Sequence, residues 1–178
     1  NRKMYVGNVR KVDASGVLQH YPDEMWVSQI DRFDTFPKRN RLSVTINDGD
    51  EIIALHQFAD RVLQFKRNNL FIINAGQDSE FLEGKYPFMG VEFKNSAVTT
   101  EVGIIWANRH GVYMYNGSNI QNLTDNRIKT TWDSFYLEEY IGLTTQDCSQ
   151  IGFDPQSKHI IILKSNNAGV GDCLIYDL

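Results

Sequence analysis

Two stretches of this chain read alike: DRVLQFKRNNLFIIN at residues 60–74 and VGIIWANRHGVYMYN at residues 102–116. They align without a gap at an offset of 42 positions. Each begins with an apolar run, continues through a polar turn with an arginine in second place, Arg67 or Arg109, and ends on a second apolar run. Short β-prone runs joined by a polar turn are typical of a hairpin. The sequence therefore predicts the same hairpin twice.

The spacing of the two copies indicates a repeat architecture. Repeats of roughly 40–50 residues are typical of β-propeller blades. Strand signals also dominate the rest of the chain, because short runs rich in Val, Ile, Tyr, Phe and Thr are bounded by Gly, Asn and Asp. We therefore expect an all-β protein, a partial β-propeller of about three to four antiparallel blades. The whole chain is expected to be a single propeller piece, with blades at about 1–35, 36–76, 77–118 and 119–178.

A ring of this size is incomplete. Propellers close with roughly 4–8 blades, and a partial ring leaves its end strands unpaired. The chain opens on Asn1 and has strand-like segments near both ends. We therefore expect it to be part of a larger propeller, and closure against another subunit is the alternative.

The strand boundaries follow from the repeat. Residues 52–66 show apolar positions near a helical period, but their second copy contains a Gly turn, so two strands at Glu51–Ala59 and Arg61–Lys66 are predicted. Leu42–Ile46 is expected to open the second blade, with Asp48–Glu51 as its hairpin turn. Val91–Phe93 is expected in the third blade.

Composition excludes several classes of protein. A net charge of -4 and a pI near 5.5 argue against a nucleic-acid-binding protein, which requires a basic surface. No apolar run approaches the ~20 residues of a membrane helix. The basic cluster Lys38–Arg41 is interpreted as a solvated turn. Cys148 and Cys173 are too few for a disulfide scaffold and are expected to be reduced, buried thiols.

Residues with catalytic or metal-binding chemistry are scattered. Neighbours on a strand face opposite sides, so Glu138 and Glu139 could not serve one glycosidic bond. The three tryptophans are interpreted as packing between adjacent blades, although an aromatic rim could also stack sugars or bases. We therefore predict no catalytic, cofactor-binding or metal-binding residues. This prediction includes all four histidines and all three tryptophans of the chain: His20, His56, His110, His159, Trp26, Trp106 and Trp132.

Three segments carry a resemblance to a known family. They are Met25–Gln29 with Asp34–Pro37, then Asp48–Leu55 leading to Leu63–Leu70, and finally Gly103–Asn108 with Gly111–Gly117. Together they resemble the β-propeller regions of bacteriophage neck and tail proteins, notably the tail-nozzle (tail tubular) proteins of short-tailed phages. The likeness covers most of residues 20–125, and its motifs are structural.

The resemblance implies a mechanical function without catalysis. Such a virion protein would form a homo-oligomeric ring below the portal and adaptor, retain packaged DNA and form part of the ejection conduit. Its partners would be portal or adaptor proteins and tail fibres or other tail subunits. DNA would pass without specific binding, and no membrane would be involved. The protein would be made in the host cytoplasm and located in the phage tail or neck. The alternatives are a receptor- or glycan-binding propeller, a hydrolase and an intracellular scaffold.

Overall fold

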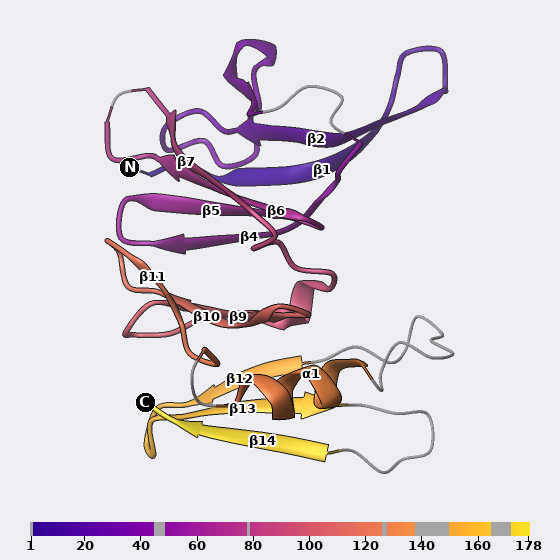
Figure 1. Cartoon of the computed structure of the whole chain (residues 1–178). Helices are drawn as coiled ribbons and strands as arrows, with labels where there is room; N and C mark the ends of the chain where they lie inside the picture. The colour runs from indigo at the N-terminus through magenta and orange to yellow at the C-terminus, as the bar shows by residue number, and fades with distance from the viewer. Residues whose placement is uncertain (1, 45–48, 78, 126–127, 138–149, 165–171) are drawn as a thin grey trace. The chain divides into compact units, whose positions relative to one another are not determined.

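A computed structural model describes residues 2–44, 49–77, 79–125, 128–137, 150–164 and 172–178 (Figure 1). Within these residues the chain is all-β, with four antiparallel sheets and one short α-helix. The chain divides into two compact units, Asn1–Gly90 and Val91–Leu178, and each unit contains two of the sheets. No helix in the described ranges is long and apolar enough to cross a membrane.

The first unit holds a three-stranded and a four-stranded sheet. Each is a meander, so strands that follow one another along the chain pair with each other. The first sheet consists of β1 (Tyr5–Val12), β2 (Leu18–Val27) and β3 (Arg41–Ser43), and the second of β4 (Ile52–Phe58), β5 (Arg61–Lys66), β6 (Asn69–Asn74) and β7 (Phe81–Pro87). A short 3-10 turn at Lys38–Asn40 precedes β3.

The second unit also holds two meander sheets, but its four-stranded sheet precedes its three-stranded one. A 3-10 turn at Lys94–Ser96 leads into its first sheet. That sheet consists of β8 (Ala97–Thr99), β9 (Ile104–Asn108), β10 (Gly111–Tyr115) and β11 (Ile120–Asn122). The α-helix follows, α1 (Lys129–Leu137), and then the second sheet, β12 (Gln150–Asp154), β13 (His159–Lys164) and β14 (Asp172–Asp177).

The structure confirms the repeated hairpin, and the strands of the two copies pair in the same register. Val62 lies opposite Ile73 in β5–β6, and the residues 42 positions later, Ile104 and Tyr115, lie opposite each other in β9–β10. Both hairpins close through two-residue turns at Arg67-Asn68 and Arg109-His110. The prediction that residues 52–66 form two strands is also confirmed, as β4 and β5. Ala59, in the left-handed region at φ 52°, makes the turn between them.

Both faces of these hairpins are buried, which explains their continuous apolar runs. All five residues of β9 are buried, and so are five of the six residues of β5. A strand covered on both faces loses the alternation of apolar and polar residues. Within residues 52–66 this holds for β5 only, since β4 is mostly half-buried.

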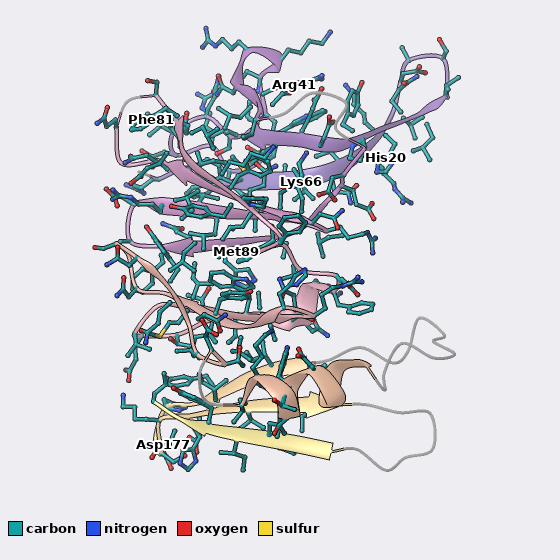
Figure 2. All side chains as sticks on the ribbon, in the orientation of Figure 1. His20, Arg41, Lys66, Phe81, Met89 and Asp177 are labelled. Carbon is teal, nitrogen blue, oxygen red and sulfur yellow. The ribbon has the colours of Figure 1, made fainter. Side chains whose placement is uncertain are left out.

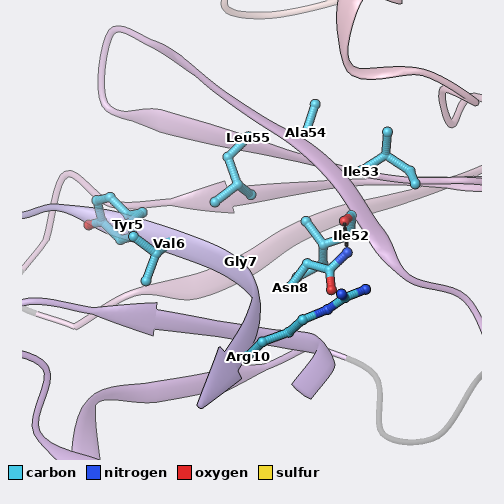
Figure 3. Close-up of a pocket in the computed structure, with 9 residues that line it drawn as sticks. All are labelled: Tyr5, Val6, Gly7, Asn8, Arg10, Ile52, Ile53, Ala54 and Leu55. Carbon is cyan, nitrogen blue, oxygen red and sulfur yellow. Dashed lines mark hydrogen bonds between the residues drawn. The ribbon is translucent and has the colours of Figure 1, made fainter. Parts of the chain in front are cut away.

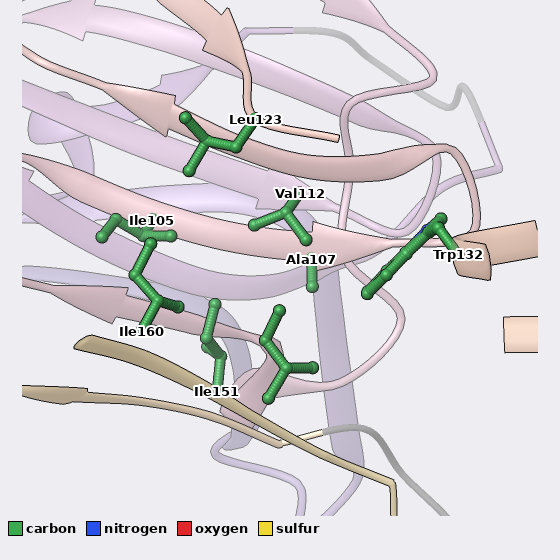
Figure 4. Close-up of a cluster of buried hydrophobic side chains, with 8 residues drawn as sticks. Ile105, Ala107, Val112, Leu123, Trp132, Ile151 and Ile160 are labelled. Atoms are coloured by element: carbon green, nitrogen blue, oxygen red, sulfur yellow. The ribbon is translucent and has the colours of Figure 1, made fainter. Parts of the chain in front are cut away.

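Each unit has its own apolar core between its two sheets. In the first unit the core joins β2 to β4–β6 through Met25, Ile52, Val62, Ile73 and Ala75. In the second unit it joins the β9–β10 hairpin and α1 to β12–β13 (Figure 4). That core consists of Ile105, Ala107, Val112, Leu123, Trp132, Ile151, Ile160 and Ile162.

One strand assignment made from the sequence was wrong. Leu42 and Ser43 do not open the second sheet, because Arg41–Ser43 pairs with β2 in the first sheet. Thr45 and Ile46 lie outside the described residues. Val91–Phe93 lies outside the strands and leads into the 3-10 turn before β8. Arg41–Ser43 is short, and the pairing partner of a short strand depends on distant residues that local composition does not reveal.

The thiol prediction was wrong for Cys173, which is a free, exposed cysteine on β14. Its neighbours Leu174 and Tyr176 face the core of the second unit, so Cys173, one position away, faces outward. Cys148 lies outside the described residues.

Candidate functional site

The first unit has a cleft where β1 runs beside β4 (Figure 3). Its volume is about 510 Å³, within the range of small-ligand pockets. Gly7 permits the close approach of the two strands, because a Cβ atom there would lie 2.9 Å from the Ile52 side chain. The cleft is lined by Tyr5, Val6, Gly7, Asn8, Arg10, Ile52, Ile53, Ala54 and Leu55.

A polar cluster sits at one end of this cleft, around Asn8. Asn8 adopts a left-handed conformation, with φ 54°, at the point where the β1–β2 register shifts. Its side-chain amide donates to the carbonyl of Ile52 at 3.0 Å and to Glu51 Oε2 at 3.4 Å. Its Oδ1 lies 2.6 Å from His20 Nε2. The bulge on β1 therefore aims an amide at β4 and joins the two sheets of the unit.

Glu51 continues the cluster into a second hollow of about 440 Å³. Arg67 donates to Glu51 Oε1 at 2.7 Å, and this hydrogen bond holds the pKa of the Glu51 carboxyl below its ordinary value. Acidic residues are prominent in the lining, but most of their carboxylates are already engaged by protein groups. The hollow is lined by His20, Tyr21, Pro22, Asp23, Glu24, Gly49, Asp50 and Glu51.

Asp50 is buried and holds the turn of the repeated hairpin. Its carboxylate accepts hydrogen bonds from the backbone N–H groups of Arg67 at 2.9 Å and Asn68 at 3.0 Å, and from the Asn69 side chain at 3.2 Å. In the other copy, 42 positions later, Glu92 takes the place of Asp50 and lies 2.8 Å from Arg109. An acid thus engages the turn in both copies.

This acid–turn pair was missed by the sequence analysis. The sequence carries little signal for it: at the offset of 42 positions Asp50 falls on Glu92, but residues 50–59 and 92–101 have no identical residue. Asp50 was expected in a turn of its own; instead it supports the next hairpin. Asp48 lies outside the described residues.

A stack of aromatic rings and a guanidinium occupies one face of β1–β3. The Arg41 guanidinium lies 4.2 Å from the centre of the Trp26 ring and 5.0 Å from that of Tyr21. Glu24 accepts a hydrogen bond from Trp26 Nε1 at 2.9 Å and pairs with Arg41 at 3.5 Å. Arg41, labelled in Figure 2, is half-buried and therefore differs from Lys38 and Arg39, which are exposed as predicted. The Tyr21 and Trp26 rings are tilted by 54° to each other, so the stack presents a half-buried aromatic and cationic surface that is not flat.

A second charged group joins the N-terminal strand to the segment before β7. Lys3 Nζ lies 2.6 Å from Glu80 Oε1, and the Tyr5 hydroxyl donates to the same oxygen at 3.0 Å. Burial opposes ionisation of Glu80, but the hydrogen bonds from Lys3 and Tyr5 outweigh it and hold the carboxyl pKa below its ordinary value. Burial and the Glu80 charge raise the pKa of the Tyr5 hydroxyl.

The histidines are placed separately. His56 is on β4 with its ring edge-to-face against Phe65, and burial lowers its pKa. His110 occupies the β9–β10 turn, as predicted, and His159 begins β13 at 4.0 Å from Asp177. Among the described residues no group of three or more His, Cys, Asp or Glu side chains could hold a metal ion.

The carboxyl pKa shifts among the described residues share one direction. Every carboxyl group whose pKa is shifted has a lowered pKa, and in each case hydrogen bonds or ion pairs stabilise the anion: Asp13, Glu51, Asp60, Glu80, Glu83 and Asp154. A general acid for glycoside hydrolysis needs a raised pKa. None of these six carboxyl groups has a raised pKa.

The tryptophans differ in their surroundings. Trp106 and Trp132 are fully buried; Trp106 stacks on Tyr113 at 5.5 Å, and Trp132 donates from Nε1 to the Asn108 carbonyl at 3.1 Å. Trp26 is half-exposed in the stack with Arg41. Glu138 and Glu139 lie outside the described residues.

Comparison of the sequence with protein-family models finds no match, and comparison with curated proteins finds none either. The functional proposal therefore rests on the sequence and on the geometry described above.

Proposed function

We propose that this chain is a β-propeller segment of a structural virion protein in a phage tail or neck. It would act as part of a nozzle-like ring that retains DNA and forms the ejection conduit, without catalysis. Its partners would be further copies of itself and neighbouring portal, adaptor or tail proteins. The observation that carries the proposal is the repeated hairpin, which has the same register in both copies and lies in segments that resemble tail-nozzle proteins.

The order of the strands supports a propeller. Within the first unit β1, the first strand of its sheet, runs beside β4, the first strand of the next sheet. Within the second unit β8 lies beside β12 in the same way. The blades of a propeller are four-stranded sheets placed around a central channel, so one strand of each sheet must line that channel. The first strands of the four sheets are the candidates.

The electrostatics support a mechanical function. A conduit wall that DNA slides past should not neutralise phosphates, because each contact releases counterions and adds affinity. Many cations of the first unit are already paired with carboxylates: Arg2 with Asp31, Lys3 with Glu80, Arg41 with Glu24, Arg61 with Asp60 and Glu83, and Arg67 with Glu51. Such pairing leaves less positive charge available for a DNA backbone.

The test is whether the protein is part of a virion. Phage particles from a lysate of the organism that encodes this sequence are purified, and their proteins are quantified by mass spectrometry. We expect peptides of this chain in a fixed ratio to the portal protein, and we expect particles made without the gene to lose packaged DNA. Absence of the chain from DNA-filled, infectious particles would refute the proposal.

A glycan-binding module is the second candidate, favoured by the Trp26–Arg41–Tyr21 stack beside the 440 Å³ hollow. Flat rings bind planar or sugar ligands by stacking, and carboxylates accept hydrogen bonds from hydroxyl groups. A glycan array tests this function. Trp26→Ala should abolish a genuine signal, and a wild-type chain that binds no glycan would eliminate the candidate.

A further inference from the structure

The turn between β10 and β11 carries the sequence NGSN at residues 116–119 (Figure 1). Asn116 is exposed, and it is the only asparagine of the chain that is followed by glycine. Gly117 has φ 98°, in the left-handed region that favours glycine. The ends of the turn are fixed, since Tyr115 pairs with Ile120 across it. The Asn116 amide therefore lies at an accessible position on an ordered backbone.

Two backbone donors hold the side-chain carbonyl of Asn116. Its Oδ1 accepts a hydrogen bond from the N–H of Ser118 at 3.0 Å and another from the N–H of Asn119 at 2.9 Å. The first of these closes an Asx turn, a hydrogen-bonded ring that contains both Asn116 Cγ and the Gly117 nitrogen. The side chain is therefore folded over the peptide bond that follows it.

The two nitrogen atoms that a ring closure would use are available. Within the described ranges, neither the side-chain amide nitrogen of Asn116 nor the backbone N–H of Gly117 donates a hydrogen bond. Glycine also has no Cβ atom, so no side chain at position 117 blocks the approach of this nitrogen to Asn116 Cγ. The nucleophile and the leaving group are thus both free of hydrogen bonds that would hold them back.

We infer that Asn116 is a site of spontaneous deamidation in the folded chain. The Gly117 nitrogen loses its proton and bonds to Asn116 Cγ; the Cγ–Nδ2 bond breaks, and Nδ2 takes up a proton and leaves as ammonia. Water then opens the resulting succinimide ring at either of its carbonyls, which gives aspartate or isoaspartate. During the attack negative charge develops on Oδ1, where the Ser118 and Asn119 N–H groups already donate, so the turn stabilises the transition state. The reaction consumes only water and does not depend on the proposed function.

Asn122, six positions later, provides an internal comparison. Its Oδ1 accepts hydrogen bonds from the backbone N–H groups of Thr124 at 2.9 Å and Asp125 at 3.1 Å, which are again the second and third residues after the asparagine. The residue that follows Asn122 is Leu123, which is buried. Asn122 therefore has the same pair of backbone donors as Asn116 but lacks the glycine.

The two products change the turn in different ways. Aspartate at position 116 leaves the main chain unaltered, and its carboxylate accepts the same two hydrogen bonds with a full negative charge. Isoaspartate routes the main chain through Cβ and Cγ, so it lengthens the turn between Tyr115 and Ile120. We expect isoaspartate to loosen β11, which lies at one end of its sheet. Both products make a chain of net charge -4 more acidic.

The experiment incubates the full, folded 178-residue chain at mildly alkaline pH and follows each asparagine by mass spectrometry of its peptides. We expect Asn116 to deamidate roughly tenfold or more faster than Asn122, because glycine alone permits the close approach of the attacking nitrogen. An isoaspartyl methyltransferase should label the product, since direct hydrolysis of the amide gives no isoaspartate. Gly117→Ala should slow the reaction several-fold. Ser118→Ala keeps the backbone donor, so it is the matched control and should leave the rate unchanged.

A second measurement needs no variant that could misfold. The wild-type chain is incubated in parallel in guanidinium chloride, where the turn and its two donors are lost. We expect Asn116 to deamidate faster in the folded chain than in the denaturant, because the donors are in place only in the turn. A reaction that is no faster in the folded chain would show that the turn does not promote it and would overturn the inference. Equal rates at Asn116 and Asn122 would overturn it as well.

Discussion

The carboxylate of Asp50 accepts a hydrogen bond of 2.9 Å from the backbone N–H of Arg67, 17 positions further along the chain. The two residues belong to different parts of the β4–β7 sheet, one before its first strand and the other in the turn of its central hairpin. The contact fixes the end of the repeated hairpin from outside it. In the second copy Glu92 stands at the position equivalent to Asp50 and pairs with the Arg109 guanidinium at 2.8 Å, so an acid contacts the turn in both copies, through the backbone in one and a side chain in the other.

Asp50→Ala should destabilise the first unit by about 2–3 kcal/mol, because it removes a buried charged acceptor from two backbone N–H groups. Urea unfolding followed by circular dichroism measures the loss. Asp13→Ala is the matched control: Asp13 supports an exposed turn in the same manner, through Ser15 and Val17, and its removal should cost less. If both variants lost the same free energy of unfolding, burial would not explain the contribution of Asp50.

Glu80→Gln should destabilise the first unit at neutral pH by about 1–3 kcal/mol, because Lys3 and Tyr5 lose their charged acceptor. The pKa of Glu80 is lower in the folded chain than its ordinary value, so its stabilisation is present above about pH 4.3 and is lost as the pH falls through the folded pKa.

The difference in melting temperature between Glu80→Gln and the wild type should therefore shrink on acidification. Glu83→Gln provides the control, since its ion pair with Arg61 is more exposed and should contribute little. A Glu80→Gln deficit that is the same at acidic and neutral pH would show that the carboxylate charge is not the cause.

Trp132→Ala should destabilise the second unit by about 3–5 kcal/mol, because a fully buried indole at the centre of its core is removed. Trp132→Phe should cost less, since it keeps most of the apolar volume and loses mainly the hydrogen bond to the Asn108 carbonyl. Hydrogen exchange with mass spectrometry measures the effect separately in the two units. We expect faster exchange in β9, β10, β12 and β13, with the peptides of Asn1–Gly90 as an internal control; equal acceleration in both units would contradict this.

Gln64→Met should stabilise the chain by about 1 kcal/mol. The Gln64 side chain is fully buried, and neither polar atom of its amide has a hydrogen-bond partner among the described residues. Methionine has a similar length and no polar group to desolvate, so the cost of the unpaired amide disappears. Gln57→Met, at an exposed position of β4, should leave the unfolding free energy unchanged. A clear loss of stability in Gln64→Met would mean that the amide is paired, for example through ordered water.

The repeat was the part of the fold that the sequence could predict. Val62 and Ile104 stand at equivalent places, and the two-residue turns at Arg67-Asn68 and Arg109-His110 follow from local turn chemistry. The pairing of Arg41–Ser43 with β2 could not be predicted, because a three-residue strand contains no local information about its partner. The exposure of Cys173 depends on which face of β14 meets the core, which one-residue shifts in register would reverse.

By itself, the sequence determined that this chain is built from repeated antiparallel hairpins, because turn residues and β-prone runs act over short distances. Only the tertiary structure decided that Asp50 supports the turn at Arg67 and that Asn8 joins β1 to β4. These relationships connect residues distant in the chain. Their energy comes from burial and from hydrogen bonds across sheets, and neither exists until the sheets have packed.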